Sequence, residues 1–131
     1  MREALYMRYR RNAPFRYAFE HPLTAHFYIS KVNNEIVKSS NGEATIIDIS
    51  PDGARLNTSL HLHPSADNLI QLILTFKLNN QEFDIRTEVI WEKPKAKSYD
   101  YGVQFITDDV TKKQLTEQLK IYARNHVTDS I

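Results

Sequence analysis

The sequence has 131 residues, of which 41% are hydrophobic and 25% are charged. This length fits one ordinary domain, and the composition is globular, which excludes an intrinsically disordered chain. The formal net charge is only +1, which argues against a long nucleic acid as the partner. The chain has no cysteine, which excludes disulfides and thiolate chemistry and is compatible with a cytoplasmic location. No apolar run approaches the ~20 residues of a membrane span, and the N-terminus lacks the apolar segment of a secretory signal.

The N-terminal segment carries an unusual concentration of arginine. Five of the eight arginines lie within the first 16 residues, and no lysine occurs before Lys31. These five are Arg2, Arg8, Arg10, Arg11 and Arg16. The guanidinium group is planar, donates hydrogen bonds as a fork and stacks on flat rings. We therefore predict a basic arm over residues 1–21, followed by one folded domain over residues 22–131. A simply solvated basic terminus is the alternative.

The first half of the predicted domain alternates apolar and polar residues. Apolar side chains occupy every second position from Leu23 to Ile29, which predicts a strand with one buried face. A turn-rich interval follows at residues 33–42, and the β-branched run at residues 44–49 predicts a second strand. Residues 54–62 are predicted to hold one or two short strands.

The second half predicts a long hairpin and one more strand. Alternation at residues 72–78 resumes at residues 83–91, and Asn79-Asn80 between them is a pair that tolerates positive φ. Tyr101, Val103 and Phe105 then mark the last predicted strand. The short intervals between these strands favour a small antiparallel barrel, either closed or split.

The C-terminus changes to a helical period. Asp108-Asp109 provides a candidate N-cap and a negative charge at a helix start. Apolar and aromatic residues then recur at helical spacing. They are Leu115, Leu119, Tyr122 and His126, with Val110 expected near the same face. The chain is thus predicted to be mainly β, with about six strands and a C-terminal α-helix.

Patterns typical of enzymes are missing. The sequence has only three glycines, with no nucleophile elbow and no glycine-rich phosphate loop. His61 and His63 would share one face of a strand, but no third ligand follows at a matching spacing. We therefore predict neither catalysis nor a metal site.

The segment Asp48-x-Ser50-x-x-Gly53 is the most suggestive motif. It places a carboxylate and a hydroxyl on the same face of a strand end, before a bend that Gly53 would permit. Both groups can accept hydrogen bonds from the N1–H and N2–H₂ edge of guanine. They can equally bond neighbouring amides in an ordinary type I turn, so the motif alone leaves both interpretations open.

The motifs taken together resemble the PilZ domain family of bacterial cyclic-di-GMP receptors. The resemblance begins with the arginine cluster and the Asp-x-Ser-x-x-Gly turn. It continues through residues 88–91, the segment Gly102-Val103-Gln104-Phe105 and the terminal helix, and so covers about residues 8–125. It implies a six-stranded antiparallel split β-barrel whose N-terminal arm folds over cyclic-di-GMP, commonly a mutually intercalated pair of molecules.

The resemblance also implies roles for the arm. Arg11 and Arg16 would clamp guanine and phosphate, with Arg10 or Arg8 as auxiliary phosphate partners. The family's two arginines are separated by three residues, whereas four residues separate Arg11 from Arg16. A bulge at Pro14, whose φ is fixed, would restore the family spacing.

On the barrel side, the resemblance implies that Asp48 and Ser50 hold the purine edge and that Gly53 permits the turn. The expected ligand is cyclic-di-GMP, and the expected partner is an effector protein, still unidentified, that reads the liganded surface. The alternative is a PilZ-like protein-interaction module that does not bind nucleotide and presents the arginine arm to an acidic partner.

Overall fold

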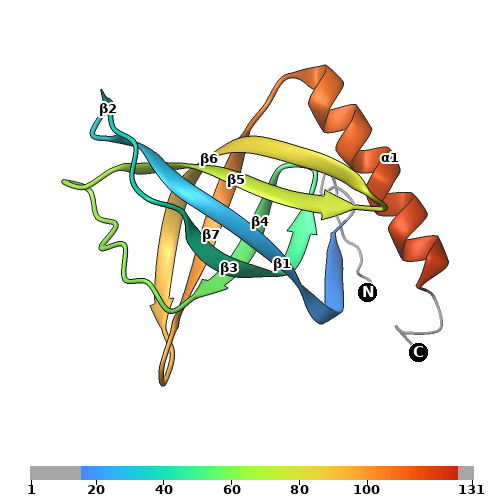
Figure 1. The fold of residues 1–131 in the computed structure, drawn as a ribbon, viewed down its shortest axis with the longest axis horizontal. Helices are drawn as coiled ribbons and strands as arrows, with labels where there is room; N and C mark the ends of the chain where they lie inside the picture. Colours follow the sequence, from blue (N-terminus) through green and yellow to red (C-terminus); the bar gives the residue numbers. More distant parts are fainter. Residues whose placement is uncertain (1–15, 127–131) are drawn as a thin grey trace.

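The computed structural model describes residues 16–126 and shows a barrel with one helix beside it (Figure 1). Its elements follow the chain in this order: β1 (Tyr17–Val32), β2 (Glu35–Ile36), β3 (Gly42–Ser50), β4 (Gly53–Thr58), β5 (Ile70–Leu78), β6 (Gln81–Pro94), β7 (Tyr99–Ile106) and α1 (Asp109–Asn125).

Six of the strands close into a barrel. They are hydrogen-bonded in the order β1-β3-β4-β7-β6-β5, and β1 pairs in turn with β5. Each of these strands thus has two neighbours, and all of the pairs are antiparallel. The two-residue β2 pairs only with the end of β1. The predicted six-stranded antiparallel barrel with a C-terminal helix is confirmed, and its closed form removes the free strand edges that promote aggregation.

Alternating side chains fill the interior of the barrel. On β5, for example, Leu72, Leu74 and Phe76 are at most 3% exposed, while the residues between them face outward. Every strand of the barrel contributes inward residues to this core. Burying each large apolar side chain stabilises the fold by about 1.5–3 kcal/mol. The period of two in the sequence therefore reports directly which face of each strand lies inside.

Asparagine pairs form the β1–β2 and β5–β6 turns. Asn79 and Asn80 have φ values of 53° and 67°, and Asn33 and Asn34 have values of 51° and 71°. Two successive positive φ angles define the type I′ turn, whose twist matches that of an antiparallel hairpin. The predicted β5–β6 hairpin is thereby confirmed.

The first strand begins earlier than expected. Residues 17–21 were assigned to the arm, but β1 starts at Tyr17, which pairs with Ile49. The register shifts between Ala18 and Leu23, so an irregular stretch interrupts the alternation just before the segment in which the sequence pattern is clear. The part of the arm that the structure describes is therefore fixed to the barrel.

The helix lies across one end of the barrel, beside the end of β5 (Figure 1). Asp108 caps it by accepting a hydrogen bond from the Thr111 amide, as predicted. Leu115 and Leu119 are fully buried, but Val110 is 66% exposed. The expectation for Val110 is wrong because five residues of an α-helix rotate a side chain about 140° away from Leu115. Within residues 16–126, the structure contains no helix of the length and apolarity that a membrane span requires.

Candidate ligand-binding site

The structure brings together two of the predicted site residues. The Nη2 atom of Arg16 lies 2.9 Å from the Oδ1 atom of Asp48. The Arg16 side chain is half exposed and the Asp48 side chain is 18% exposed. This ion pair joins the residue just before β1 to the first residue of the Asp-x-Ser-x-x-Gly motif.

Strand geometry places Asp48 and Ser50 on the outer face of the barrel. Ile49, between them, is fully buried in the core, so its neighbours point away from the core. The Asp48 side chain is 18% exposed there, whereas Ser50 is covered and only 4% exposed. The register between β3 and β4 shifts between Ile46 and Asp48, which makes Ile47 an extra residue of a β-bulge. The bulge changes the direction of the strand end that follows it. Asp48 and Ser50 both come after it and are two residues apart, so their side chains leave the strand on the same face.

Ser50 belongs to the turn itself. Its Oγ accepts a hydrogen bond from the Asp52 amide at 3.2 Å and donates to the Gly53 carbonyl at 3.5 Å. No residue of this turn has a positive φ, as the predicted type I turn requires. For Ser50, the local interpretation of the motif describes the contacts in the structure. For Asp48 it does not, because its carboxylate pairs with Arg16.

Gly53 is needed for a reason that differs from the expected one. Its φ is not positive, so the bend does not depend on the conformational freedom of glycine. A Cβ atom at this position would lie only 2.4 Å from the carbonyl oxygen of Val103. Gly53 therefore allows the main chains of β4 and β7 to approach closely beside the turn.

An aromatic residue that the sequence analysis did not select lies next to this turn. Trp91 was expected to continue the buried alternation of its strand, but it is 43% exposed. The β6–β7 register shifts between Val89 and Trp91, so Ile90 is an extra residue that turns the indole outward. A Cβ atom on Gly102 would meet the indole Nε1 at 2.0 Å. The indole thus lies against the main chain of β7, in space that only glycine leaves open.

These residues line a shallow groove of about 250 Å³ on the outer face. Its lining includes Arg16, Ser50, Gly53, Trp91, Gly102 and Gln104. The groove combines an exposed cation with an aromatic ring, which is chemistry that can bind a purine with its phosphate. It is also lined by the acidic Asp52, whose carboxylate is paired with Lys112. A larger groove of about 560 Å³ between β1, β3 and β4 has Glu43 as its only charged lining residue, so it offers no cation to a phosphate ligand, whereas the smaller groove offers Arg16.

The motif turn is also tied to the helix. Lys112 Nζ lies 2.7 Å from Asp52 Oδ1, and the hydrogen bond to Asp52, together with its charge, raises the pKa of Lys112. The Phe105 amide donates to the Asp52 carbonyl at 2.8 Å. A change in the conformation of this turn would therefore reach both the end of β7 and the start of α1.

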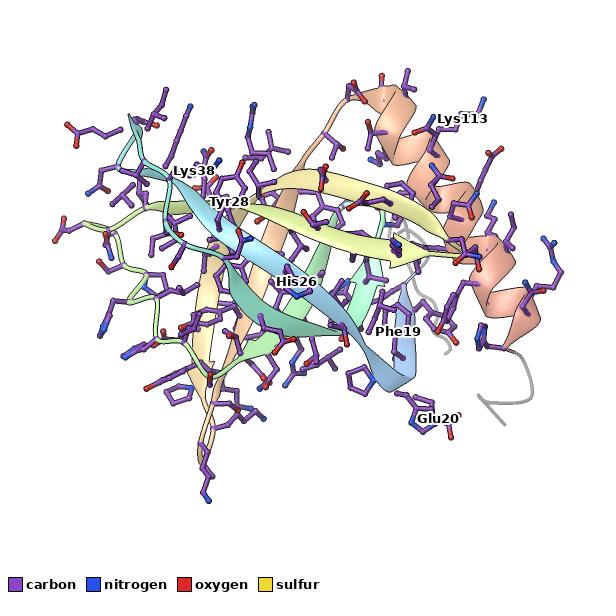
Figure 2. All side chains as sticks on the ribbon, in the orientation of Figure 1. Phe19, Glu20, His26, Tyr28, Lys38 and Lys113 are labelled. Atoms are coloured by element: carbon purple, nitrogen blue, oxygen red, sulfur yellow. The ribbon has the colours of Figure 1, made fainter. Side chains whose placement is uncertain are left out.

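Three aromatic rings fix the chain just after Arg16. Tyr17, Phe19 and Tyr122 contact one another edge to face, with ring centroids 5.1–5.5 Å apart. Figure 2 shows Phe19 at the start of β1 on the side of the helix. This contact anchors the base of the arm, because Tyr17 follows Arg16 directly.

The remaining candidates lie elsewhere. Arg10 and Arg11, and the auxiliary Arg8, lie outside the residues that the structure describes. The rings of His61 and His63 contact each other at a tilt of 35°, with centroids 3.6 Å apart, but they lie in the loop after β4 and not on a strand. His63 has a φ of 57°, and the Leu62 amide donates to the Tyr101 hydroxyl instead of to a neighbouring strand. Over residues 16–126, no group of three or more His, Cys, Asp or Glu side chains is arranged to hold a metal.

Sequence reasoning found one side of this groove and missed the other. Asp48, Ser50 and Gly53 were selected as a contiguous motif, whereas Trp91 and Gly102 come from two strands. The pairing of Trp91 with Gly102 across β6 and β7 could have been found by aligning the predicted hairpin with the last strand. The bulge that turns Trp91 outward has no signal in the alternation.

Comparisons with known proteins identify the family and the fold. A family model of the PilZ domain matches residues 9–120, while no curated protein matches the chain. The PilZ domain of YcgR from Escherichia coli, solved with c-di-GMP, shares 12% identity at a TM-score of 0.60, covering 92% of this chain and 98% of that one. A second structure, of YcgR from Escherichia coli in complex with c-di-GMP, shares 16% identity at a TM-score of 0.56, covering 92% of this chain and 51% of that one.

The PilZ domain of CeSA from a cellulose synthesizing bacterium shares 10% identity at a TM-score of 0.55, covering 80% of this chain and 93% of that one. At these identities the solved structures establish a shared fold. The match to the family model extends over most of the sequence, from just before the predicted clamp arginines to the last turns of α1. The chain therefore belongs to the PilZ domain family.

Proposed function

We propose that this chain is a cytoplasmic receptor for cyclic-di-GMP that acts through a protein partner and has no catalytic activity of its own. The observation that carries the proposal is the Arg16–Asp48 ion pair beside a groove that also holds Ser50 and Gly53. These residues come from two distant parts of the sequence, and family membership alone does not place them together.

The chemistry of the groove suits a guanine nucleotide. Arginine can donate two hydrogen bonds to guanine O6 and N7, and each such contact gives about 1–3 kcal/mol of discrimination. Asp48 can accept from the N1–H and N2–H₂ edge of a base when Arg16 turns toward the ligand. The exposed face of Trp91 offers a surface on which a purine can stack.

The proposal also includes two arginines that precede Arg16 in the sequence. We propose that Arg11 adds a second guanidinium to the ligand contacts and that Arg10 supplies a further phosphate contact. A second arginine is expected to matter because phosphate and guanine offer separate acceptors, and a bidentate donor satisfies only one set at a time.

Titration calorimetry with cyclic-di-GMP tests the proposal. We expect the unaltered chain to bind in the micromolar range or tighter, and Arg16→Ala to weaken binding by about 10–100-fold, the factor that corresponds to one lost bidentate contact. Arg86→Ala is the matched control, since Arg86 is exposed on β6 and does not line the groove. Binding should also weaken as ionic strength rises, because phosphate contacts are screened.

Flat heats for the unaltered chain at high ligand concentration would refute the receptor proposal. They would favour the second candidate, an interaction module in which Arg16 and the other arginines meet an acidic protein. Equal losses for Arg16→Ala and Arg86→Ala would show that overall positive charge, and not this groove, attracts the nucleotide.

A further inference from the structure

Arg55 lies on β4, between the strand that carries Asp48 and the strand that carries Gly102. In the register of the barrel, Arg55 on β4 lies opposite Asp48 on β3 and opposite Gly102 on β7. Gly102 in turn pairs with Trp91 on β6. Neighbouring strands lie ~4.8 Å apart, so this arginine is one strand away from the motif carboxylate and two strands away from the indole.

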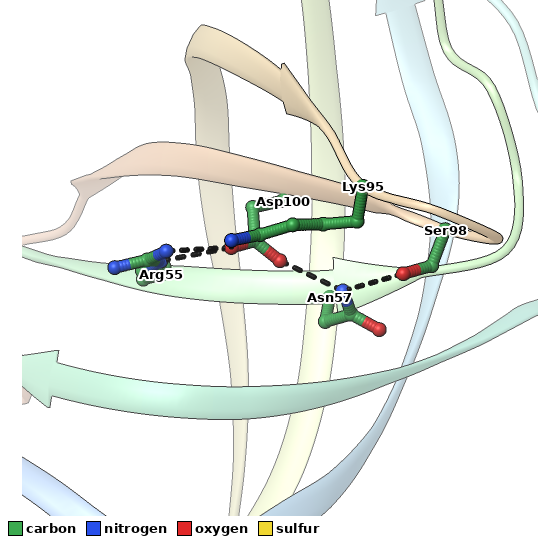
Figure 3. A network of polar contacts seen from close by, with 5 residues as sticks. All are labelled: Arg55, Asn57, Lys95, Ser98 and Asp100. Atoms are coloured by element: carbon green, nitrogen blue, oxygen red, sulfur yellow. Dashed lines mark hydrogen bonds and ion pairs between the residues drawn. The ribbon is translucent and has the colours of Figure 1, made fainter.

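A buried carboxylate fixes the Arg55 side chain. The Nε and Nη2 atoms of Arg55 both donate to Asp100 Oδ2, at 3.1 and 2.7 Å (Figure 3). Asp100 is only 2% exposed, and its other oxygen accepts from Asn57 at 2.7 Å. Lys95 approaches the same carboxylate at 3.6 Å. Two donors on one acceptor define the plane of the guanidinium, so Arg55 has little freedom to rotate.

The fixed guanidinium in turn lies over Trp91. Its central carbon is 6.0 Å from the centroid of the indole ring, at the outer limit of a cation–π contact. The indole also lies against the main chain of β7 at Gly102. Trp91 is 43% exposed and follows a bulge, so these two contacts constrain an indole that is otherwise partly open to solvent.

We propose that Arg55 is a positioning residue: held by Asp100, it keeps the indole of Trp91 against Gly102, so that the ring forms one wall of the groove. The orientation of Trp91 stands on the contacts above. Its consequence for nucleotide affinity rests on the proposed function.

Trp91 is the only tryptophan of the chain, so its fluorescence reports this orientation directly. In nucleotide-free protein, we expect Arg55→Gln to red-shift the emission and to raise the acrylamide quenching constant. Lys95→Gln is the matched control: it removes the same charge from the same carboxylate, whereas the cation that lies over Trp91 is Arg55. We further expect Arg55→Gln to bind cyclic-di-GMP about 2–5-fold more weakly, the factor of one exposed cation–π contact.

Arg55→Gln leaves Asp100 buried with fewer partners, so folding needs its own safeguard. The double variant Arg55→Gln with Asp100→Asn removes both charges and should fold while showing the same increase in quenching. Wild-type quenching in both variants, or an equal change in Lys95→Gln, would overturn the positioning role. Wild-type affinity despite increased quenching would overturn its link to the groove. If the unaltered chain binds no cyclic-di-GMP, the proposed function fails, and the quenching comparison alone still decides whether Arg55 orients Trp91.

Discussion

Gly53 lies where β4 begins, and the main chain of β7 passes close to its Cα atom. The presence of glycine at a turn is usually explained by a positive φ angle, but the φ angle of Gly53 is not positive. The carbonyl oxygen of Val103 occupies the space that a Cβ atom would need. A backbone atom held in a closed barrel cannot move aside as a side chain can, so the identity of this residue is set by the neighbouring strand.

We therefore expect Gly53→Ala to lower the free energy of unfolding by about 1–3 kcal/mol, the usual cost of overpacking. Gly42→Ala is the control: its Cβ would meet the tips of the Leu60 and Phe27 side chains at 2.7 and 2.8 Å, and side chains can shift. Urea unfolding should show the larger loss for Gly53→Ala. Equal losses would mean that the approach of β7 is not what requires glycine at position 53.

Between β4 and β7, a polar network replaces apolar packing on the outer face. Burial alone would raise the pKa of Asp100, but hydrogen bonds from Asn57 and Arg55, together with the charges of Arg55 and Lys95, hold this pKa below its ordinary value of 3.8. The folded state therefore binds the proton more weakly than the unfolded chain does. The stability that Asp100 contributes is full above about pH 4 and is lost as the pH falls through the lowered pKa.

We expect Asp100→Asn to lower the free energy of unfolding by about 1–3 kcal/mol at pH 7, because charged partners lose an anion. The difference from wild type should shrink at pH 3, because the unfolded chain takes up a proton there that the folded carboxylate, with its lowered pKa, binds more weakly. Urea unfolding at both pH values measures this. Asp84→Asn, which alters an exposed carboxylate bound by Thr75, should give a smaller change at pH 7. A difference for Asp100→Asn that does not depend on pH would contradict the ionised state of Asp100.

Across the whole molecule, the sequence predicts those features that depend on residues close to one another along the chain. Alternation identified the inward faces of the strands, the asparagine pair identified the β5–β6 turn, and Asp108 identified the helix start. Closure of the barrel is different, because the pairing of β1 with β5 joins Phe27 to Leu74 and leaves no mark in either segment alone. Strand count and type were therefore predictable, while the choice between a closed and a split barrel was not.

The same limit explains the candidate site. The predicted motif residues lie within one short segment, residues 48–53, so their closeness in the fold follows directly from their closeness in the sequence. Trp91 turns outward because of a bulge, and the start of β1 at Tyr17 is set by contacts with β3 and α1. Each depends on residues far away in the sequence. The groove was therefore found from its contiguous side only, and its wall on β6 required the structure.

The two ends of the described chain meet at Tyr122, and this contact holds Arg16 in place. The ring of Tyr122 touches both Tyr17 and Phe19, so Tyr122→Ala should release the start of β1 from the helix. We expect the free energy of unfolding to fall by about 2–4 kcal/mol and amide hydrogen exchange at residues 17–19 to accelerate more than at β5.

Tyr28→Ala is the control for this prediction. Tyr28 lies farther along the same strand, beside Lys38, whose Nζ is 5.6 Å from the ring centroid (Figure 2). Tyr28→Ala should lower the free energy of unfolding by less and leave amide exchange at residues 17–19 unchanged, because Tyr28 is not part of the aromatic contact between the start of β1 and the helix. Unaltered exchange at residues 17–19 in Tyr122→Ala would mean that pairing with β3 alone fixes this segment. Faster exchange there would establish that the terminal helix positions the residue that begins the groove.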